Sequence, residues 1–167
     1  TRRLPALPGW SRRASATLFL NSGPLSLDPA YFQQFIDAGG TVNSHTFQHP
    51  KLRELGQEAQ RQQICGMAQQ IEATYGSAGY FFRPPYGEFN DDTLIAARSC
   101  GLRALLLWRV SLNDGGFQTW GNRPIAAGDI VLGHFRDDLY DCLVTLFTEL
   151  DRLGLRVARV EDYLPAA

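Results

Sequence analysis

Two of the protein's three histidines lie four residues apart, in the segment His45-Thr-Phe-Gln-His49. Side chains with this spacing in a helical turn point to the same side, so both imidazoles can reach one metal ion. Imidazole is a good ligand for zinc and similar divalent metals. Pro50 disfavours helical geometry at His49, which indicates a turn rather than a helix interior. The spacing alone is a weak signal, and two structural histidines remain the alternative.

The third histidine, His134, follows the apolar segment Asp-Ile-Val-Leu-Gly. An unperturbed imidazole has a pKa of about 6.5, which suits proton transfer around neutral pH. His134 is therefore a candidate for a third metal ligand or for an acid/base group. A hydrogen-bonded residue at the end of a strand is the alternative without chemistry.

Short apolar segments alternate with helical patterns along the chain. Strands are predicted at residues 16–20, 41–44, 80–82, 105–108, 130–132 and 156–160, and helices at residues 28–38, 50–75, 90–100 and 137–153. Residues 111–128 contain five glycines or prolines and are predicted to form a long loop. This order favours one α/β domain over residues 1–167, with a parallel sheet covered by helices.

Ligands bind such folds at the carboxyl ends of the strands, so polar residues at those positions are candidates for a site. Asn21, His45, Arg83, residues 108–111 and His134 meet this condition. All three histidines fall at strand ends, since His49 lies in the turn that follows His45. The strand ends therefore predict where the chemistry lies.

Composition excludes several classes of protein. The chain has 167 residues and a net charge of −1, so nucleic acid and anionic membranes are poor partners. No apolar run approaches the roughly 18 residues that span a bilayer, and the start resembles no signal peptide. Cys65, Cys100 and Cys142 form no CxxC pattern. Buried, inert thiols are the favoured interpretation, and a single disulfide, which the sequence does not place, is the alternative.

Several segments together resemble one family, the NodB-type polysaccharide deacetylases. Residues 44–52 (Ser-His-Thr-Phe-Gln-His-Pro-Lys-Leu) resemble the second motif of the family, and residues 82–87 (Phe-Arg-Pro-Pro-Tyr-Gly) resemble the third. Residues 132–134 (Leu-Gly-His) are similar to the fifth motif, and residues 16–19 to the Ala-Thr-Phe-Phe strand. The matches follow the family's order over about residues 15–164.

The resemblance implies a distorted, incomplete (β/α) barrel and a hydrolase that removes N-acetyl or O-acetyl groups from a polysaccharide. It implies zinc, with cobalt or nickel as substitutes, held by His45, His49 and an aspartate, while Thr46 braces the loop between the histidines. The resemblance also implies catalytic and substrate-binding roles. Arg83 would orient the base, the backbone N–H of Tyr86 would bind the oxyanion, His134 would protonate the leaving group, and Pro84, Leu132 and Trp120 would bind substrate, Leu132 and Trp120 as the acetyl-methyl pocket.

For Trp108 and Trp120, ordinary core packing is the alternative to a role in binding. The long 111–128 loop is the expected source of specificity, and Phe117 and Trp120 would stack on sugar rings if they are exposed. A polysaccharide substrate implies an extracellular or cell-wall-facing location, and we expect a monomer.

The sequence departs from the family at two motifs. The first motif, Thr-Phe-Asp-Asp-Gly, supplies the base and the third metal ligand, but no acidic residue precedes Asp28. We expect the barrel's N-terminal strand to lie before Thr1, with residues 4–13 as the tail of the helix that follows it. The alternative is a catalytically inactive, carbohydrate-binding domain. In the fourth motif, Ser111 stands where an aspartate should support the catalytic histidine, and Asp114 is either its replacement or a turn residue.

Overall fold

The computed structural model describes residues 16–164, so the expectation for residues 4–13 lies outside the described part. These residues separate into two compact units. We call residues 16–107 and 159–164 the histidine unit and residues 108–158 the hairpin unit, and each is described by itself. The single domain over residues 1–167 stays a prediction.

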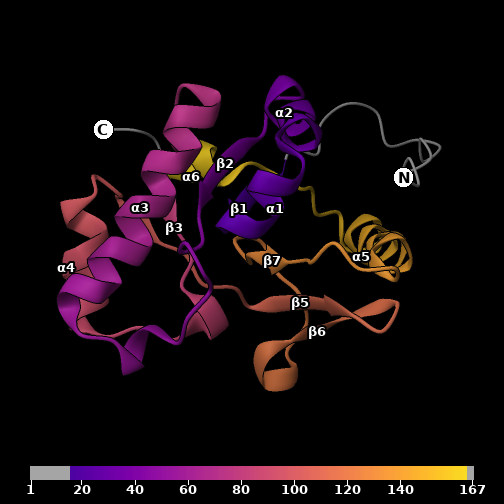
Figure 1. Ribbon diagram of the computed structural model, residues 1–167. Helices are drawn as coiled ribbons and strands as arrows, with labels where there is room; N and C mark the ends of the chain where they lie inside the picture. Colours follow the sequence, from indigo (N-terminus) through magenta and orange to yellow (C-terminus); the bar gives the residue numbers. More distant parts are fainter. Residues whose placement is uncertain (1–15, 165–167) are drawn as a thin grey trace. The chain divides into compact units, whose positions relative to one another are not determined.

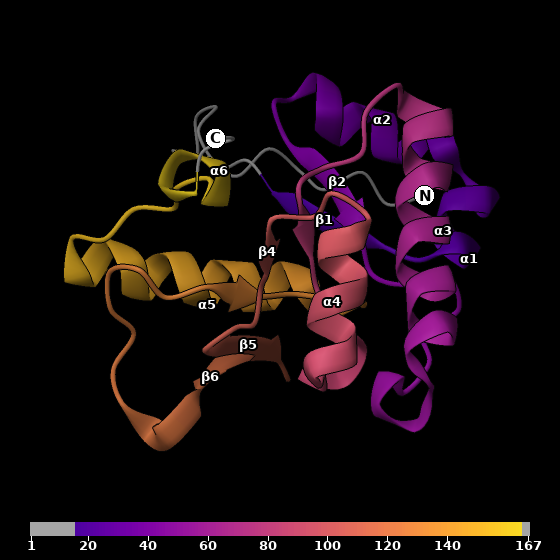
Figure 2. The ribbon, with the colours of Figure 1, turned by 90° about the vertical axis from the view of Figure 1, so that its left-hand side faces the viewer.

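Four described strands of the histidine unit form a parallel sheet in the order β1-β2-β3-β4 (Figures 1 and 2). They are β1 (Thr17–Leu20), β2 (Thr41–Ser44), β3 (Phe81–Phe82) and β4 (Ala104–Leu105). The helices are α1 (Ser22–Leu27), α2 (Pro29–Asp37), α3 (Gln57–Tyr75), α4 (Asp91–Ser99) and α6 (Val160–Tyr163), with short 3-10 turns η1 (Leu52–Glu54) and η2 (Pro85–Gly87). α3 and α4 pack side by side (Figure 2). The predicted parallel sheet with helices is confirmed.

Local sequence signals explain most of these boundaries. The Asp28 carboxylate accepts a hydrogen bond from the Tyr31 N–H at 3.0 Å and caps α2, with proline as the first helical residue. Asn90 and Thr93 form a reciprocal capping box at the start of α4. Gly76 adopts a left-handed conformation with φ of 78° and ends α3.

Three predictions for this unit were wrong in extent or type. α3 begins at Gln57 rather than at residue 50, because Gly56 is its N-cap and a separate 3-10 turn precedes it. The strand predicted for residues 105–108 ends at Leu105. Residues 156–160 form no strand. Helix α6 begins at the last of these residues, Val160, and the two acidic residues in its first turn favour a helix N-terminus. α1 was not predicted, although proline in its first turn is a helix-start signal.

The hairpin unit contains the described strands β5 (Val110–Asn113), β6 (Gly116–Thr119) and β7 (Val131–Leu132), in the order β6-β5-β7. β5 pairs antiparallel with β6 and parallel with β7. The 3-10 turn η3 (Trp120–Asn122) and helix α5 (Leu139–Leu153) complete the unit. The core lies between one side of β5 and one side of α5, and it consists of Val110, Leu112, Ile125, Cys142, Leu146 and Leu150.

The long loop predicted for residues 111–128 was therefore wrong. Asn113 pairs with Gly116, so Asp114 and Gly115 form a two-residue hairpin turn. Their φ angles of 54° and 70° are those of the turn type that favours Asp-Gly. Asp114 is therefore a turn residue.

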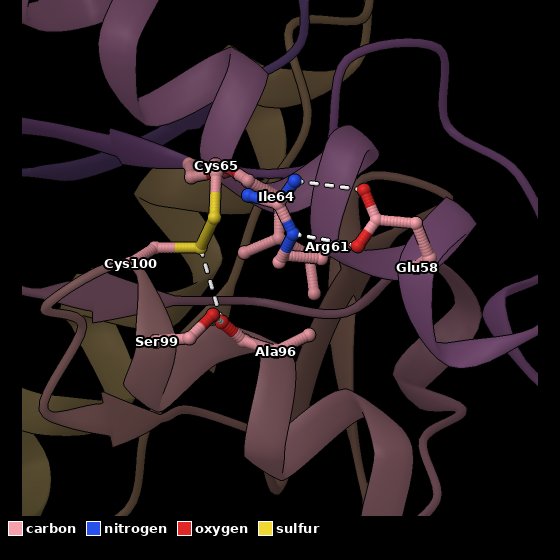
Figure 3. The surroundings of a disulfide bond; sticks show 8 residues. Glu58, Arg61, Ile64, Cys65, Ala96, Ser99 and Cys100 are labelled. Atoms are coloured by element: carbon pink, nitrogen blue, oxygen red, sulfur yellow. Dashed lines mark hydrogen bonds and ion pairs between the residues drawn. A yellow bond between two sulfur atoms is a disulfide. The ribbon is translucent and has the colours of Figure 1, made fainter.

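The cysteine prediction was wrong for two of the three residues. Cys65 on α3 and Cys100 after α4 form a disulfide that links the two helices, with Cα atoms 5.2 Å apart (Figure 3). Cys142 is a buried thiol on α5. Burial raises the pKa of the Cys142 thiol, and the nearby Asp138 carboxylate raises it further. Cys142 alone fits the predicted inert cysteine.

Candidate metal and catalytic site

The site begins where β2 and β3 end. Ser44 and Phe82 are paired in the sheet, so the residues that follow them, His45 and Arg83, lie next to each other. The Nδ1 atom of His45 is 2.6 Å from the backbone carbonyl oxygen of Arg83. This hydrogen bond assigns the proton to Nδ1 and leaves the lone pair on Nε2.

The second histidine faces the first across the turn. The ring centroids of His45 and His49 are 4.8 Å apart, with the rings inclined at 73°. The Tyr86 ring lies 4.8 Å from the His49 ring on an edge-to-face contact. The Thr46 hydroxyl accepts a hydrogen bond from the backbone N–H of His49 at 3.1 Å, which is the bracing role expected of Thr46. The structure therefore brings both histidines and the third-motif tyrosine together.

The turn that carries the histidines is anchored to two helices. The Phe47 N–H donates to the Gln63 carbonyl on α3 at 2.9 Å, and the Ser22 N–H of α1 donates to the Phe47 carbonyl at 3.0 Å. The Ser44 hydroxyl donates to the Ile64 carbonyl on α3 at 3.2 Å. These bonds between distant segments fix the turn, and no sequence motif signals them.

Backbone strain is concentrated at this site. Among residues 16–164, five non-glycine residues have positive φ, and three of them are Thr46 (67°), His49 (60°) and Tyr86 (60°). Each such conformation costs on the order of 1–3 kcal/mol, and it persists only where the surrounding structure enforces it. A cluster of this kind is typical of a functional site.

Arg83 contributes a buried positive charge. Its residue is 8% exposed, and the guanidinium carbon lies 4.1 Å from the centroid of the Phe19 ring. Burial lowers the pKa of Arg83 to about 10, because desolvation disfavours the charged form. The guanidinium remains charged at neutral pH and can attract a carboxylate.

The two imidazoles fit a zinc-type site. A histidine that binds metal through one ring nitrogen commonly donates the other N–H to a carbonyl or carboxylate, as His45 does to Arg83. Catalytic zinc sites use three protein ligands. Within residues 16–164, no group of three His, Cys, Asp or Glu side chains is placed to hold an ion. Among the described residues, His45 and His49 are therefore candidates for two of the three ligands of such a site.

Pro84, predicted to bind substrate, is buried. We expect it to shape the turn between Arg83 and Tyr86 rather than to touch the polysaccharide. Tyr86 itself is 58% exposed, so its ring can meet a ligand.

The remaining predicted residues lie in the hairpin unit. Leu132 ends β7 and is buried, whereas His134 follows it and is exposed. Trp120 is 75% exposed, which excludes ordinary core packing for this side chain. The cavity beside Trp120 is lined by Trp108 as well, and Leu132 is not among the residues that line it.

The histidine unit thus combines a parallel sheet with paired histidines and a buried arginine at its strand ends. The family model for polysaccharide deacetylase matches residues 11–105. The chain belongs to the polysaccharide deacetylase family. Among residues 16–164, no helix has the length and apolar character needed to cross a membrane.

Relatives in sequence include characterised and uncharacterised proteins. An uncharacterised protein of Streptomyces coelicolor is 36% identical over 97% of this chain and 68% of its own length. A peptidoglycan-N-acetylglucosamine deacetylase of Bacillus cereus is 30% identical over 47% of this chain, and PgdA, a protein of the same name from Listeria monocytogenes, is 26% identical over 88%. The chain spans only 29% and 32% of the length of these two deacetylases.

Solved structures share the fold. A family 4 carbohydrate esterase from Streptomyces lividans, in complex with acetate, has a TM-score of 0.70 at 23% identity over 86% of this chain and 79% of its own. A family 4 pseudoenzyme from Bacillus anthracis has a TM-score of 0.76 at 24% identity over 89% and 55%. A mutant described as a pseudoenzyme with restored enzymatic activity matches with a TM-score of 0.76 at 25% identity over 89% and 57%. The fold thus occurs both in an esterase and in a pseudoenzyme.

Proposed function

We propose that this chain belongs to a metal-dependent hydrolase that removes N-acetyl or O-acetyl groups from a polysaccharide. The observation that carries the proposal is the histidine pair, whose ring centroids lie 4.8 Å apart, with the Nδ1 of His45 bonded to the Arg83 carbonyl. Membership of the polysaccharide deacetylase family supports the substrate class.

His45 and His49 would hold zinc, or cobalt or nickel in its place. When bound, such a metal polarises the acetyl carbonyl and lowers the pKa of its water towards about 7. Arg83 would orient the carboxylate base and keep it ionised, since a nearby positive charge favours the carboxylate. The base and the third ligand remain to be assigned, because the 167 residues contain no Thr-Phe-Asp-Asp-Gly motif.

Three further residues would act on the substrate. The backbone N–H of Tyr86 would donate to the oxyanion that develops on the acetyl carbonyl. His134 would protonate the leaving amine or alkoxide. Leu132 would contact the acetyl methyl group. Each of these roles is assigned from the family motif that the residue matches.

The disulfide between Cys65 and Cys100 supports the proposed extracellular or wall-facing location. Disulfides persist in oxidising compartments and are rare in the cytosol. Two relatives are named as peptidoglycan deacetylases, which agrees with a substrate in the cell wall.

A second candidate function is binding of a polysaccharide without catalysis. It is motivated by a structural neighbour at 25% identity that is described as a pseudoenzyme with restored enzymatic activity. In this case the strand-end site would hold a ligand but release no acetate.

Two assays test the proposal: calorimetry measures zinc binding, and acetate release is measured on a tetramer of N-acetylglucosamine. Each assay is carried out on this chain and on the full-length gene product. We expect His45→Ala to abolish zinc binding and acetate release while the circular dichroism spectrum is retained. Lys51→Ala is the matched control, because its side chain lies near the same turn and is 58% exposed.

Zinc binding without acetate release from any acetylated glycan by the full-length product would establish the non-catalytic alternative. Unfolding of the His45→Ala variant would instead indicate a structural zinc site. Absence of zinc binding in the full-length product would refute both metal-based interpretations.

A further inference from the structure

Two consecutive residues between the histidines, Phe47 and Gln48, are both bonded to Gln63 of α3. The Gln63 carbonyl accepts a hydrogen bond from the Phe47 N–H at 2.9 Å. The Gln63 side-chain Oε1 accepts one from the Gln48 N–H at 2.9 Å, and its Nε2 donates to the Gln48 Oε1 at 3.3 Å. The Gln63 side chain thus pairs with both the backbone and the side chain of Gln48.

These bonds lie between two strained residues. Thr46 and His49 have φ angles of 67° and 60°, and Phe47 and Gln48 are the residues that separate them. A conformation of this kind persists only where the surrounding structure enforces it. Because Gln63 binds the turn from a neighbouring helix, it is a candidate for that enforcement.

The N–H groups of residues 47–49 all have acceptors. The His49 N–H donates to the Thr46 hydroxyl within the turn, whereas the other two donate to Gln63. Of these two, the Gln48 N–H is bonded to the Gln63 side chain and the Phe47 N–H to its backbone. A substitution at Gln63 can therefore remove one bond to the turn and leave the other in place.

This part of α3 is well suited to serve as a fixed support. Ile64 follows Gln63 and is 0% exposed, and Cys65 is joined by its disulfide to Cys100 after α4. The Phe47 ring also lies against the helix, because a Cβ at Gly66 would be 3.7 Å from a carbon of that ring. Functional side chains keep a precise geometry when a rigid element holds the residues that carry them.

We propose that Gln63 is a positioning residue of the candidate metal site, and that its side-chain amide holds the His49 imidazole in the orientation that faces His45 and Tyr86. Gln63 acts through the Gln48 N–H. An amide suits this position because it offers an acceptor to that N–H and a donor to the Gln48 Oε1. Metal binding by the imidazole rests on the proposed function, whereas the hydrogen bonds and the ring contacts do not.

NMR spectroscopy of the metal-free chain tests this role directly. Gln63→Leu removes the amide and keeps a side chain that favours a helix. The Gln48 N–H should then lose its protection from hydrogen exchange, while the Phe47 N–H, bonded to the Gln63 backbone, should stay protected. The ring centroids of His49 and Tyr86 are 4.8 Å apart, so the nuclear Overhauser effect between these rings should be present in the unmodified protein and weakened in Gln63→Leu.

Gln62→Leu is the matched control, because Gln62 is the preceding residue of α3, is exposed, and donates its side-chain N–H to Glu58 at 3.2 Å. It should keep the ring-to-ring signal of the unmodified protein. Gln63→Glu should restore that signal, since its carboxylate accepts from the Gln48 N–H and the Gln48 amide can turn to donate to it. Gln63→Asn keeps the amide but shortens its reach, so it should show the same loss as Gln63→Leu and serves as the second variant.

Zinc calorimetry on the same proteins extends the test to the metal. Losing the support of one hydrogen bond should weaken zinc binding about two- to tenfold in Gln63→Leu and leave it unchanged in Gln62→Leu. An unweakened ring-to-ring signal in both Gln63→Leu and Gln63→Asn would overturn the proposal, as would an equal loss in Gln62→Leu or an unchanged zinc affinity in Gln63→Leu. Absence of zinc binding by the unmodified protein would count against the proposed function, whereas the metal-free spectra would still decide whether Gln63 positions His49.

Discussion

The Cys65–Cys100 disulfide is predicted to contribute a large part of the stability of the histidine unit. The two cysteines are separated by 35 positions in the sequence. In the chain-entropy model, a closed loop of about 35 residues lowers the entropy of the unfolded state by roughly 13 cal/mol/K, or about 4 kcal/mol at 25 °C. The double variant Cys65→Ala/Cys100→Ala removes this constraint.

The fold should survive the substitution, because other contacts also join α3 and α4. The Thr93 hydroxyl donates to the Gln60 side chain at 2.5 Å, and both residues are completely buried. Ile64, next to the disulfide, packs in the same core cluster as Ala96 of α4 (Figure 3). We therefore expect a loss of about 2–4 kcal/mol in the free energy of unfolding rather than loss of structure.

Urea unfolding monitored by circular dichroism, with and without a thiol reductant, measures this loss. The unreduced protein should show one reactive thiol after denaturation, Cys142, and the reduced protein should show three. Reductant should lower the stability of the unmodified protein and leave the double variant unchanged. Cys142→Ala is the control, because its effect should be the same with and without reductant. Three thiols in the unreduced protein, or a midpoint insensitive to reductant, would refute the reasoning.

Three further changes test local features. Gly79→Ala would place a Cβ against the buried Asn43 amide, whose oxygen accepts a hydrogen bond from a β3 backbone N–H. The substitution should lower the free energy of unfolding, measured in urea, by about 1–3 kcal/mol. An unchanged unfolding midpoint would contradict the contact. Gly115→Val should lower it by about 1–2 kcal/mol, because φ is 70° at this turn position, and a thermal melt no lower than that of the parent would refute the turn. Thr46→Val removes the acceptor of the His49 N–H and should weaken zinc binding, measured by calorimetry, about tenfold. Thr46→Ser keeps the hydroxyl and should keep the zinc affinity of the unmodified protein. Equal zinc affinities of the two variants would show that the Thr46 hydroxyl does not support His49 as a ligand.

Local signals predicted much of the fold. Asp28 with its following proline, Asn90 and Gly76 start or end helices through hydrogen bonds or φ angles within a few residues, so the sequence reveals them. Asp114-Gly115 is an equally local hairpin signal, although the glycine and proline content of residues 111–128 is also typical of a loop. Residues 156–160 contain enough apolar residues for a strand, but a strand also needs a pairing partner in a sheet, and whether a distant segment provides one cannot be inferred locally.

The sequence predicted that the two histidines lie together, but it did not predict the geometry around them. The spacing of His45 and His49 placed both rings on one turn, and the structure has them 4.8 Å apart. The contact of Tyr86 with His49 joins residues far apart in sequence and depends on how β2 and β3 pair. The disulfide likewise depends on the packing of α3 against α4, which no cysteine spacing reports.

The positive φ angles of Thr46, His49 and Tyr86 are the feature that most favours a ligand site maintained by selection. The alternative is a site that has lost its function while the fold was inherited. Thr46 is β-branched, so a positive φ is especially unfavourable for it, yet its hydroxyl in this conformation holds the His49 backbone. Tyr86 adopts a second strained conformation and contacts the same histidine. Substitution by glycine would relieve the positive φ at either position, but it would also remove the hydroxyl or the ring that contacts His49. Both residues therefore favour a fixed orientation of His49 over stability, as a metal ligand requires.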